Sequence, residues 1–134
     1  MVNYPLYISS SQVESLKQLA TTTTSGVSRI CCHEDPSSLI QIMLIALTKS
    51  KRYDFIRDNI PGLLIFLCLE GSLEIETISE DHVSNTFQLS NGESLTVPRS
   101  YWRKTFALTD VSVYLECIEG AFDRQKRESM FDQT

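Results

Sequence analysis

Residues 63–118 read LLIFLCLEGSLEIETISEDHVSNTFQLSNGESLTVPRSYWRKTFALTDVSVYLECI. In this stretch, short apolar or alternating runs end at turn-forming residues such as Glu70-Gly71, Ser90-Asn91-Gly92 and Thr109-Asp110. The pattern predicts strands at 63–69, 73–78, 83–89, 94–98, 102–108 and 111–118. Short strands that follow one another across turns, without alternating helices, are typical of an all-β sandwich or barrel.

Two further strands are predicted before this stretch. Residues 27–33 form the first, which Glu34-Asp35-Pro36 closes. Residues 39–47 are apolar at nearly every position, so the run is compatible with a buried helix or with a strand covered on both faces. Its length of nine residues and its three isoleucines favour the strand.

The beginning of the chain predicts a short helix. Ser11 and Glu14 have the spacing of a capping box, in which the two residues satisfy each other's backbone N–H groups. The apolar residues that recur on one face are Val13, Leu16 and Leu19. Residues 21–26, four threonines followed by Ser-Gly, are poor helix formers and end the helix.

Length and composition indicate one globular domain. The chain has 134 residues, 42% of them hydrophobic, and a formal net charge of −5. We divide it into a helical lead-in at 1–26, a barrel at 27–122 and a polar tail at 123–134. The negative charge argues against a nucleic-acid partner, and no apolar run approaches the ~20 residues of a membrane span. No basic residue precedes the first apolar ones, so we expect no secretory signal and a cytoplasmic location.

Glycine and proline spacing narrows the fold to one family pattern. Two cupin signatures are usually written G-x5-H-x-H-x3-4-E-x6-G and G-x5-P-x-G-x2-H-x3-N. Five residues separate Gly92 from Pro98, as in the second signature, and Arg103 then occupies its histidine position. Gly71 fits the glycine that ends the first signature. Counting back from Gly71 places Leu64 at the glutamate position, and the two histidine positions fall on Arg57 and Asn59.

The chain most resembles the WbuC-type cupins, small proteins of O-antigen and related surface-polysaccharide gene clusters. This resemblance implies a double-stranded β-helix (jelly-roll) barrel with a short N-terminal helix, usually loaded with a metal. The matching stretches are Arg29, His33-Glu34-Asp35-Pro36, Gln41-x-Met43-Leu44-Ile45-Ala46-Leu47, Tyr53, Phe66, Leu69-Glu70-Gly71, Val97-Pro98, Trp102, Leu115-Glu116 and Gly120-x-Phe122-Asp123.

The residues at the metal positions depart from the family pattern. A divalent transition metal needs imidazole, carboxylate or thiolate donors. Arginine and leucine offer no lone pair, and asparagine offers one neutral oxygen. The four cysteines form no C-x-x-C pair, so they indicate no zinc site either. We therefore predict a protein with no metal and no other cofactor.

The altered site suggests a cationic pocket. If strand alternation is kept, Arg57, Asn59 and Arg103 point into the mouth of the barrel. Guanidinium groups pair with carboxylate or phosphate, which predicts an anionic ligand: a sugar acid, a phosphosugar or a nucleotide sugar. Alternatively, the arginines reach into solvent or pair with Glu116 or Asp58, and bind no ligand.

Further residues are candidates for the same ligand site. His33 and Arg29 match the family pattern and are candidates to line it, although a structural, hydrogen-bonded histidine fits equally well. Tyr53 and Trp102 could stack on a sugar ring or pack in the barrel. Glu116 lies on an apolar strand, either as an internal partner for an arginine or facing solvent.

Three function classes remain open. The first is a non-catalytic binding or accessory protein of surface-polysaccharide biosynthesis. The second is a metal-independent nucleotide-sugar epimerase or isomerase, with His33 as the base and Tyr53 or Tyr101 as the acid. The third is a structural domain with a vestigial pocket. Because the strands at 39–47 and 63–69 are apolar on both faces, we expect a homodimer in all three classes.

Overall fold

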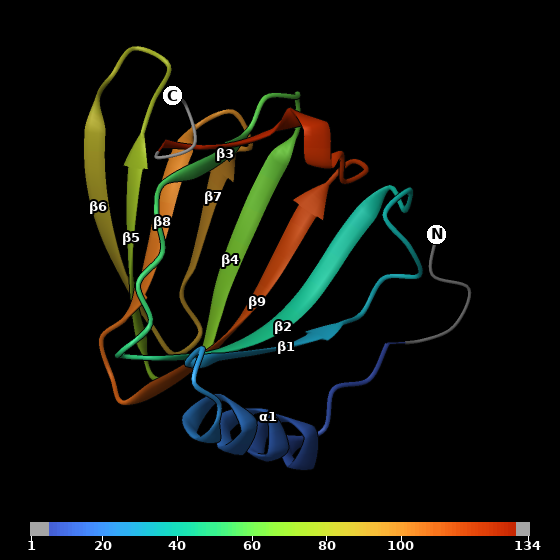
Figure 1. The fold of residues 1–134 in the computed structure, drawn as a ribbon, viewed down its shortest axis with the longest axis vertical. Helices are drawn as coiled ribbons and strands as arrows, with labels where there is room; N and C mark the ends of the chain where they lie inside the picture. The colour runs from blue at the N-terminus through green and yellow to red at the C-terminus, as the bar shows by residue number, and fades with distance from the viewer. Residues whose placement is uncertain (1–5, 131–134) are drawn as a thin grey trace.

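Two antiparallel five-stranded sheets face each other in the computed structural model, which describes residues 6–130 (Figure 1). The strand order of the first sheet is β1 (Val27–Cys31), β2 (Ile40–Thr48), β9 (Val111–Glu119), β4 (Leu63–Glu70) and β7 (Ser94–Pro98). That of the second is β10 (Arg127–Ser129), β3 (Ile56–Asp58), β8 (Trp102–Ala107), β5 (Ser72–Ile78) and β6 (Ser84–Ser90). The predicted all-β jelly-roll barrel is confirmed.

The predicted strands agree with the observed ones to within two residues at most ends. The apolar run at 39–47 is a strand, because β1 and β9 pair with its two edges along its length. The strand predicted at 27–33 ends earlier, at Cys31. Beyond that point the His33 side chain takes the place of a backbone acceptor for β2, because its Nδ1 accepts a hydrogen bond from the Ile42 backbone N–H at 3.1 Å.

The helix α1 (Ser10–Thr22) is present, but its cap differs from the prediction. The capping box is formed by Ser9 and Gln12, not by Ser11 and Glu14. The Ser9 Oγ accepts from the Gln12 N–H at 3.2 Å, and the Gln12 Oε1 accepts from the Ser9 N–H at 2.8 Å. Two serines before the predicted cap made either register possible on sequence grounds.

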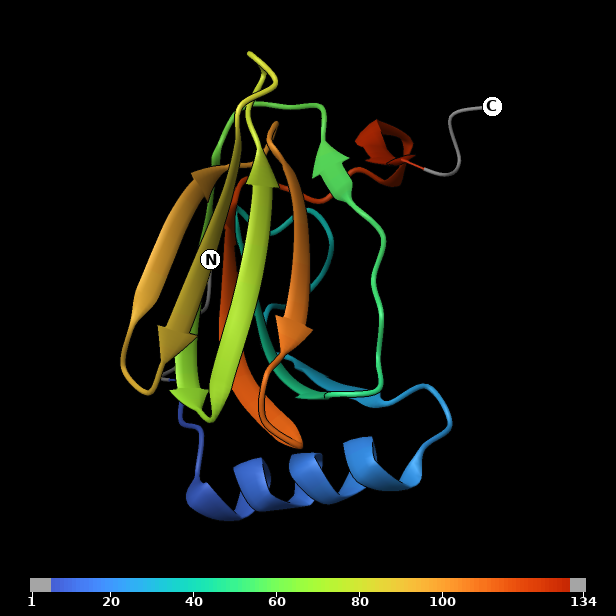
Figure 2. The ribbon, with the colours of Figure 1, turned by 90° about the vertical axis from the view of Figure 1, so that its left-hand side faces the viewer.

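The helix packs on the first sheet, on the face that points away from the barrel interior (Figure 2). Leu16 and Ala20 are buried against Leu44, Ala46 and Val113 of β2 and β9. Leu19, which the sequence assigned to the buried face, is 55% exposed. No described helix is long and apolar enough to cross a membrane.

The barrel interior holds the main hydrophobic core. Phe66 and Tyr114 lie in it with their ring centroids 6.1 Å apart. On the opposite face of β4, Leu63, Ile65 and Leu69 remain 45%, 39% and 38% exposed. These exposed side chains agree with a strand that is apolar on both faces, and the homodimer stays a prediction.

The polar tail contributes a strand that the sequence did not predict. A 3₁₀ helix at Arg124–Lys126 leads into β10, which pairs with β3 so that Arg127 lies opposite Asp58 and Glu128 opposite Arg57. Both strands have only three residues, too few for an alternating pattern to be visible. This pairing brings the end of the chain to the mouth of the barrel.

Candidate functional site

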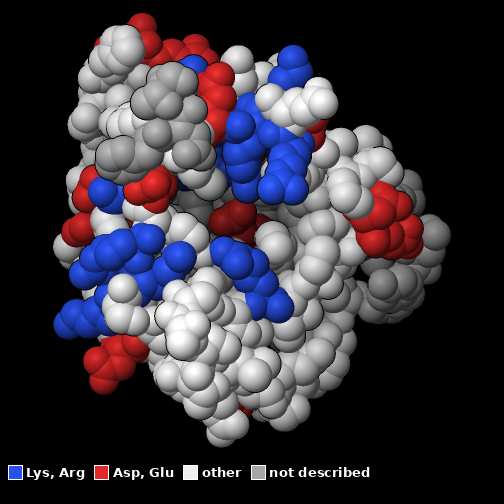
Figure 3. Space-filling view, viewed as in Figure 1, with Lys and Arg blue, Asp and Glu red and all other residues white. Residues whose placement is uncertain are grey.

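A pocket of about 340 Å³ opens between the two sheets. Its charged lining residues are Arg29, Arg103, Lys104, Arg127, Asp54 and Glu116. The other lining residues include Met43, Ile45, Tyr53, Ile56, Phe66, Thr105 and Tyr114. Figure 3 shows a hollow on this side of the molecule, with basic groups on its borders and acidic atoms within it. The pocket therefore combines an apolar wall with an excess of basic side chains.

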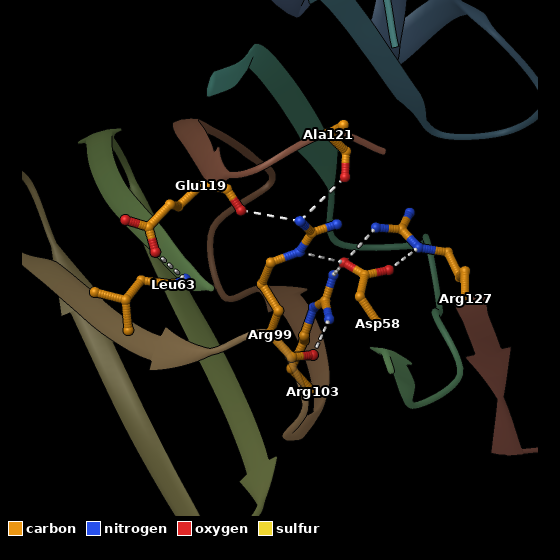
Figure 4. Close-up of polar contacts among 7 residues, drawn as sticks. All are labelled: Asp58, Leu63, Arg99, Arg103, Glu119, Ala121 and Arg127. Atoms are coloured by element: carbon orange, nitrogen blue, oxygen red, sulfur yellow. Dashed lines mark hydrogen bonds and ion pairs between the residues drawn. The ribbon is translucent and has the colours of Figure 1, made fainter. Parts of the chain in front are cut away.

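Asp58, which is 1% exposed, is the centre of a cluster of three arginines (Figure 4), two of which, Arg103 and Arg127, line this pocket. Its Oδ2 accepts hydrogen bonds from Arg99 Nε at 3.2 Å, Arg103 Nη2 at 3.3 Å and Arg127 Nη2 at 3.1 Å. Its Oδ1 accepts from Arg127 Nε at 2.8 Å. We call these four residues the Asp58 cluster.

The charges in the Asp58 cluster keep its carboxylate ionised. Burial by itself opposes ionisation, but the hydrogen bond from Arg127 and the charges of Arg103, Arg127 and Arg99 outweigh it. Together they hold the pKa of Asp58 below its ordinary value of 3.8. A buried carboxylate with this many partners is a structural anion, and its oxygens are not free to bind a ligand.

Arg99 is fully buried and is held by backbone as well as by Asp58. Its Nη1 donates to the carbonyls of Glu119 and Ala121 at 2.9 and 3.2 Å. Glycines with positive φ make room for it, because a Cβ on Gly62 would lie 3.1 Å from Arg99 Cδ and one on Gly120 3.0 Å from Arg99 Nη1. Its Nη2 is buried with no hydrogen-bond partner among residues 6–130.

Arg103 reaches the barrel interior, as the sequence predicted, but it is engaged there. It is 3% exposed and donates to Asp58 and, at 3.2 Å, to the carbonyl of Arg99. The sequence left open whether this arginine reaches into solvent or pairs with Glu116 or Asp58, and pairing with Asp58 is observed. Arg103 therefore shapes the charge of the pocket and has little freedom to grip a ligand.

Arg57 and Asn59 do not point into the barrel mouth, which corrects the prediction. Arg57 pairs with its cross-strand neighbour Glu128 at 2.5 Å, and its guanidinium lies 4.6 Å from the ring centroid of Trp102. Asn59 is exposed. Since Asp58 between them is 1% exposed and faces the arginines, strand alternation turns both neighbours outward.

Arg29, Tyr53 and Glu116 are brought together in the pocket, whereas His33 and Trp102 are not. The Tyr53 hydroxyl accepts a hydrogen bond from Arg29 Nη2 at 2.5 Å. His33 is the structural histidine of the alternative reading: besides its bond to the Ile42 N–H, its Nε2 lies 3.2 Å from the Cys31 sulfur. Trp102 serves as the platform for Arg57.

Glu116 is a carboxyl group on the pocket wall with no hydrogen bond or ion pair to other residues in the described range 6–130. Loss of solvation raises its pKa above the ordinary value of 4.5, against the opposing charges of Arg103, Arg127 and Arg29, while Asp58 raises it further. The sequence left open whether Glu116 pairs with an arginine or faces solvent. It does neither directly, because it faces the pocket.

The raised pKa of Glu116 predicts a stability difference that depends on pH. The folded protein binds this proton more tightly than the unfolded chain, so wild-type stability falls as the pH rises above 4.5 through the folded-state pKa. Glu116→Gln cannot titrate, so we expect its stability relative to wild type to be higher at pH 7.5 than at pH 5 by urea unfolding. An unchanged difference between the two pH values would contradict the assignment.

Sequence reasoning missed several of the residues that build this site. Asp58 was considered only as a partner for the arginines, and Arg99, Arg127 and Tyr114 were not considered at all. Arg127 lies in a segment that was assigned to the polar tail, and its role depends on the pairing of β10 with β3. The one available signal was an Asp at position 58, in the short segment between Ile56 and Ile60, in a chain with several arginines.

Comparison with solved structures identifies the fold. The chain resembles SO0799 from Shewanella oneidensis with a TM-score of 0.69 at 16% identity, over 87% of this chain and 83% of that one. KdgF from Halomonas sp. has a TM-score of 0.59 at 15% identity, over 75% of this chain and 84% of that one. Oxalate decarboxylase from Bacillus subtilis has a TM-score of 0.66 at 14% identity, over 79% of this chain but only 28% of that one. The fold is that of the cupins. No family model and no curated protein matches this sequence.

The residues of this cupin barrel do not fit a transition metal. At one histidine position stands Arg103, a fixed cation without a lone pair. Asp58 already gives both oxygens to arginines, which leaves Glu116 and the exposed Asp54 as the carboxylates of the pocket lining. Within residues 6–130, no group of three or more His, Cys, Asp or Glu side chains could hold a metal ion.

We expect the purified protein to carry far less than one equivalent of manganese, iron, nickel or zinc. Elemental analysis after chelator-free purification measures this directly. Replacing both Arg57 and Asn59 by histidine should leave the metal content unchanged, because these positions face away from the cupin interior. Near-stoichiometric metal in the wild-type protein would show that the ligands come from residues other than those considered.

Proposed function

We propose that this chain is a metal-free cupin-fold protein that binds an anionic small molecule in the pocket between the sheets. The supporting observation is that Arg29, from β1, and Arg127, from β10, face the same pocket from opposite sheets. Arg29 uses only Nη2, on Tyr53, and Arg127 uses Nε and Nη2, on Asp58. Within the described part of the chain the Nη1 group of each has no partner, so each can donate to a carboxylate or phosphate.

The resemblance to WbuC-type cupins suggests the biological setting. Those proteins are associated with surface-polysaccharide gene clusters, where sugar acids, phosphosugars and nucleotide sugars are the anionic metabolites. We propose that the protein binds one of these and acts as an accessory protein without turnover. The apolar and aromatic wall, which includes Tyr53, Phe66 and Tyr114, is suited to the face of a sugar ring.

Isothermal titration calorimetry with D-glucuronate, glucose 6-phosphate and a nucleotide sugar tests this proposal. We expect at least one of them to bind, and Arg29→Gln to weaken that binding about tenfold, as loss of a charge-assisted hydrogen bond does. Arg124→Gln is the matched control, since Arg124 is exposed and does not line the pocket. No binding by any of the three, or equal effects of the two variants, would contradict the proposal.

A second candidate function, which we also propose for test, is a metal-independent epimerisation, for which the pocket holds a different base from the one predicted. His33 lies outside the pocket, but Glu116 and Tyr53 both line it and could serve as base and acid. Incorporation of deuterium from D₂O into the sugar carbon of a bound nucleotide sugar, followed by NMR, would distinguish turnover from binding alone. Loss of that exchange in Glu116→Gln is the expected signature.

A further inference from the structure

Glu116 lies at the inner wall of the pocket, among apolar neighbours. In the first sheet it is directly opposite Met43 of β2 on one side and Phe66 of β4 on the other, and all three line the pocket. A carboxylate between two apolar side chains has no local donor. The unpaired arginine nitrogens are at the edges instead, since β1 and β10 are the edge strands of their sheets. The acceptor of the pocket is thus central and its donors are peripheral.

The charged groups around Glu116 leave its oxygens available. Arg103 on β8 is committed to Asp58 and to the Arg99 carbonyl, and Arg127 on β10 is committed to Asp58 through two nitrogens. Arg29 on β1 donates to Tyr53. None of these residues forms an ion pair within 4.0 Å of Glu116 in the described range. Glu116 is partly buried and faces the pocket without a donor from the described residues, so an occupant that donates a hydrogen bond there gains affinity.

The local charge decides between the two kinds of donor. An ammonium group and a hydroxyl group could each donate to Glu116. The lining of the pocket carries four cations (Arg29, Arg103, Lys104 and Arg127) against two anions, Asp54 and Glu116. This excess of positive charge opposes a cationic group, whereas a neutral hydroxyl donates without that penalty. The donor that fits is a hydroxyl.

We infer that the pocket selects a monosaccharide-sized hydroxy acid, whose hydroxyl donates to Glu116 while its carboxylate is held by Arg29 and Arg127. A volume of about 340 Å³ is at the small end for ligand pockets and suits one sugar ring with its substituents, not an enclosed nucleotide sugar. Tyr53 accepts from Arg29 and keeps its own proton to donate to the ligand. This inference rests on the proposed function and adds to it the class and orientation of the ligand.

The experiment compares two acids of similar ring size in wild type and variants. D-glucuronate carries hydroxyls, and cyclohexanecarboxylate carries none. We expect wild type to bind glucuronate at least tenfold more tightly, and Glu116→Leu, which removes the acceptor, to bring the two affinities within about threefold. Glu116→Gln, which keeps the shape and one oxygen, carries the same test if the leucine variant does not fold, and should narrow the gap less. Calorimetry gives both affinities, and thermal unfolding checks each variant's fold.

The outcomes separate this inference from the function on which it rests. If neither acid binds wild type, the proposed anion-binding function fails. If both acids bind equally, or if the preference for glucuronate is unchanged in the folded Glu116 variants, Glu116 does not select a hydroxyl and the inference is overturned while anion binding stands. If glucuronate is preferred and the preference falls in the variants, the inference is supported.

Discussion

Replacing Asp58 by asparagine should lower the free energy of unfolding by about 3–5 kcal/mol, because breaking a buried ion pair leaves its partners as uncompensated charges. Two of the three partner arginines are themselves buried, with side chains 1% and 4% exposed. Urea unfolding at neutral pH measures the effect. Asp54→Asn is the control, since Asp54 is an exposed aspartate four residues earlier and should change stability by no more than about 0.5 kcal/mol.

The pH dependence of the same variant provides a second measurement. Because the folded-state pKa of Asp58 is below 3.8, its ionisation contributes stability that is present above that pH and is lost as the pH falls through the folded value. The difference between wild type and Asp58→Asn should therefore shrink in acid. A constant difference, or a variant as stable as wild type at pH 7, would show that the cluster contributes little to folding.

Truncating Phe66 to alanine should cost a similar amount, about 3–5 kcal/mol, since it removes a buried aromatic ring and leaves a cavity. Phe66 is 1% exposed, contacts Tyr114 and lines the pocket. The same substitution at Phe87 on β6, which is 37% exposed, is the matched control and should cost much less. Chemical denaturation of the two variants side by side gives the comparison.

Ligand binding adds a second readout to the Phe66 substitution. The alanine variant removes part of the apolar wall of the pocket next to Glu116, so its affinity for any sugar that binds wild type should fall. Equal losses of stability at Phe66 and Phe87 would mean that the interior is not packed around the Phe66 ring. In that case Phe66 would not form the apolar wall of the pocket.

Most of the fold could be predicted because its strands show two signals in the sequence, an alternation of apolar and polar residues and turn-forming residues at both ends. In β5, for example, Leu73, Ile75 and Thr77 are buried while the residues between them are partly exposed, and turns follow at both ends. Such a pattern needs no knowledge of the partner strand. In β3 and β10, with three residues each, pairing alone determines the structure, and pairing joins residues about 70 positions apart, as in the bond between Arg127 and Asp58.

The site was predicted only in part, because alternation along a strand shows which residues share a face only when one residue is already known to face inward. Counting along the chain placed Arg57 and Asn59 inside, but a shift of one residue exchanges the two faces of a strand. Between this strand and β4 lies a tight connection that includes Gly62, with a φ of 130°. Its geometry sets which residue faces inward, and the result is Asp58. Arg29, Tyr53 and Glu116, which match the family pattern, line one pocket, and their role in binding a ligand stays a prediction.

Sharing one carboxylate among three arginines also constrains how this sequence can diverge. A lineage that loses Arg127 first gives up a side chain that is 30% exposed and leaves Asp58 with two partners. A lineage that loses Asp58 first leaves three guanidinium groups facing one another. Substitutions at these four positions should therefore be strongly non-additive, and position 58 should be the last to change. In descendants of this chain, aspartate at 58 should outlast arginine at 127.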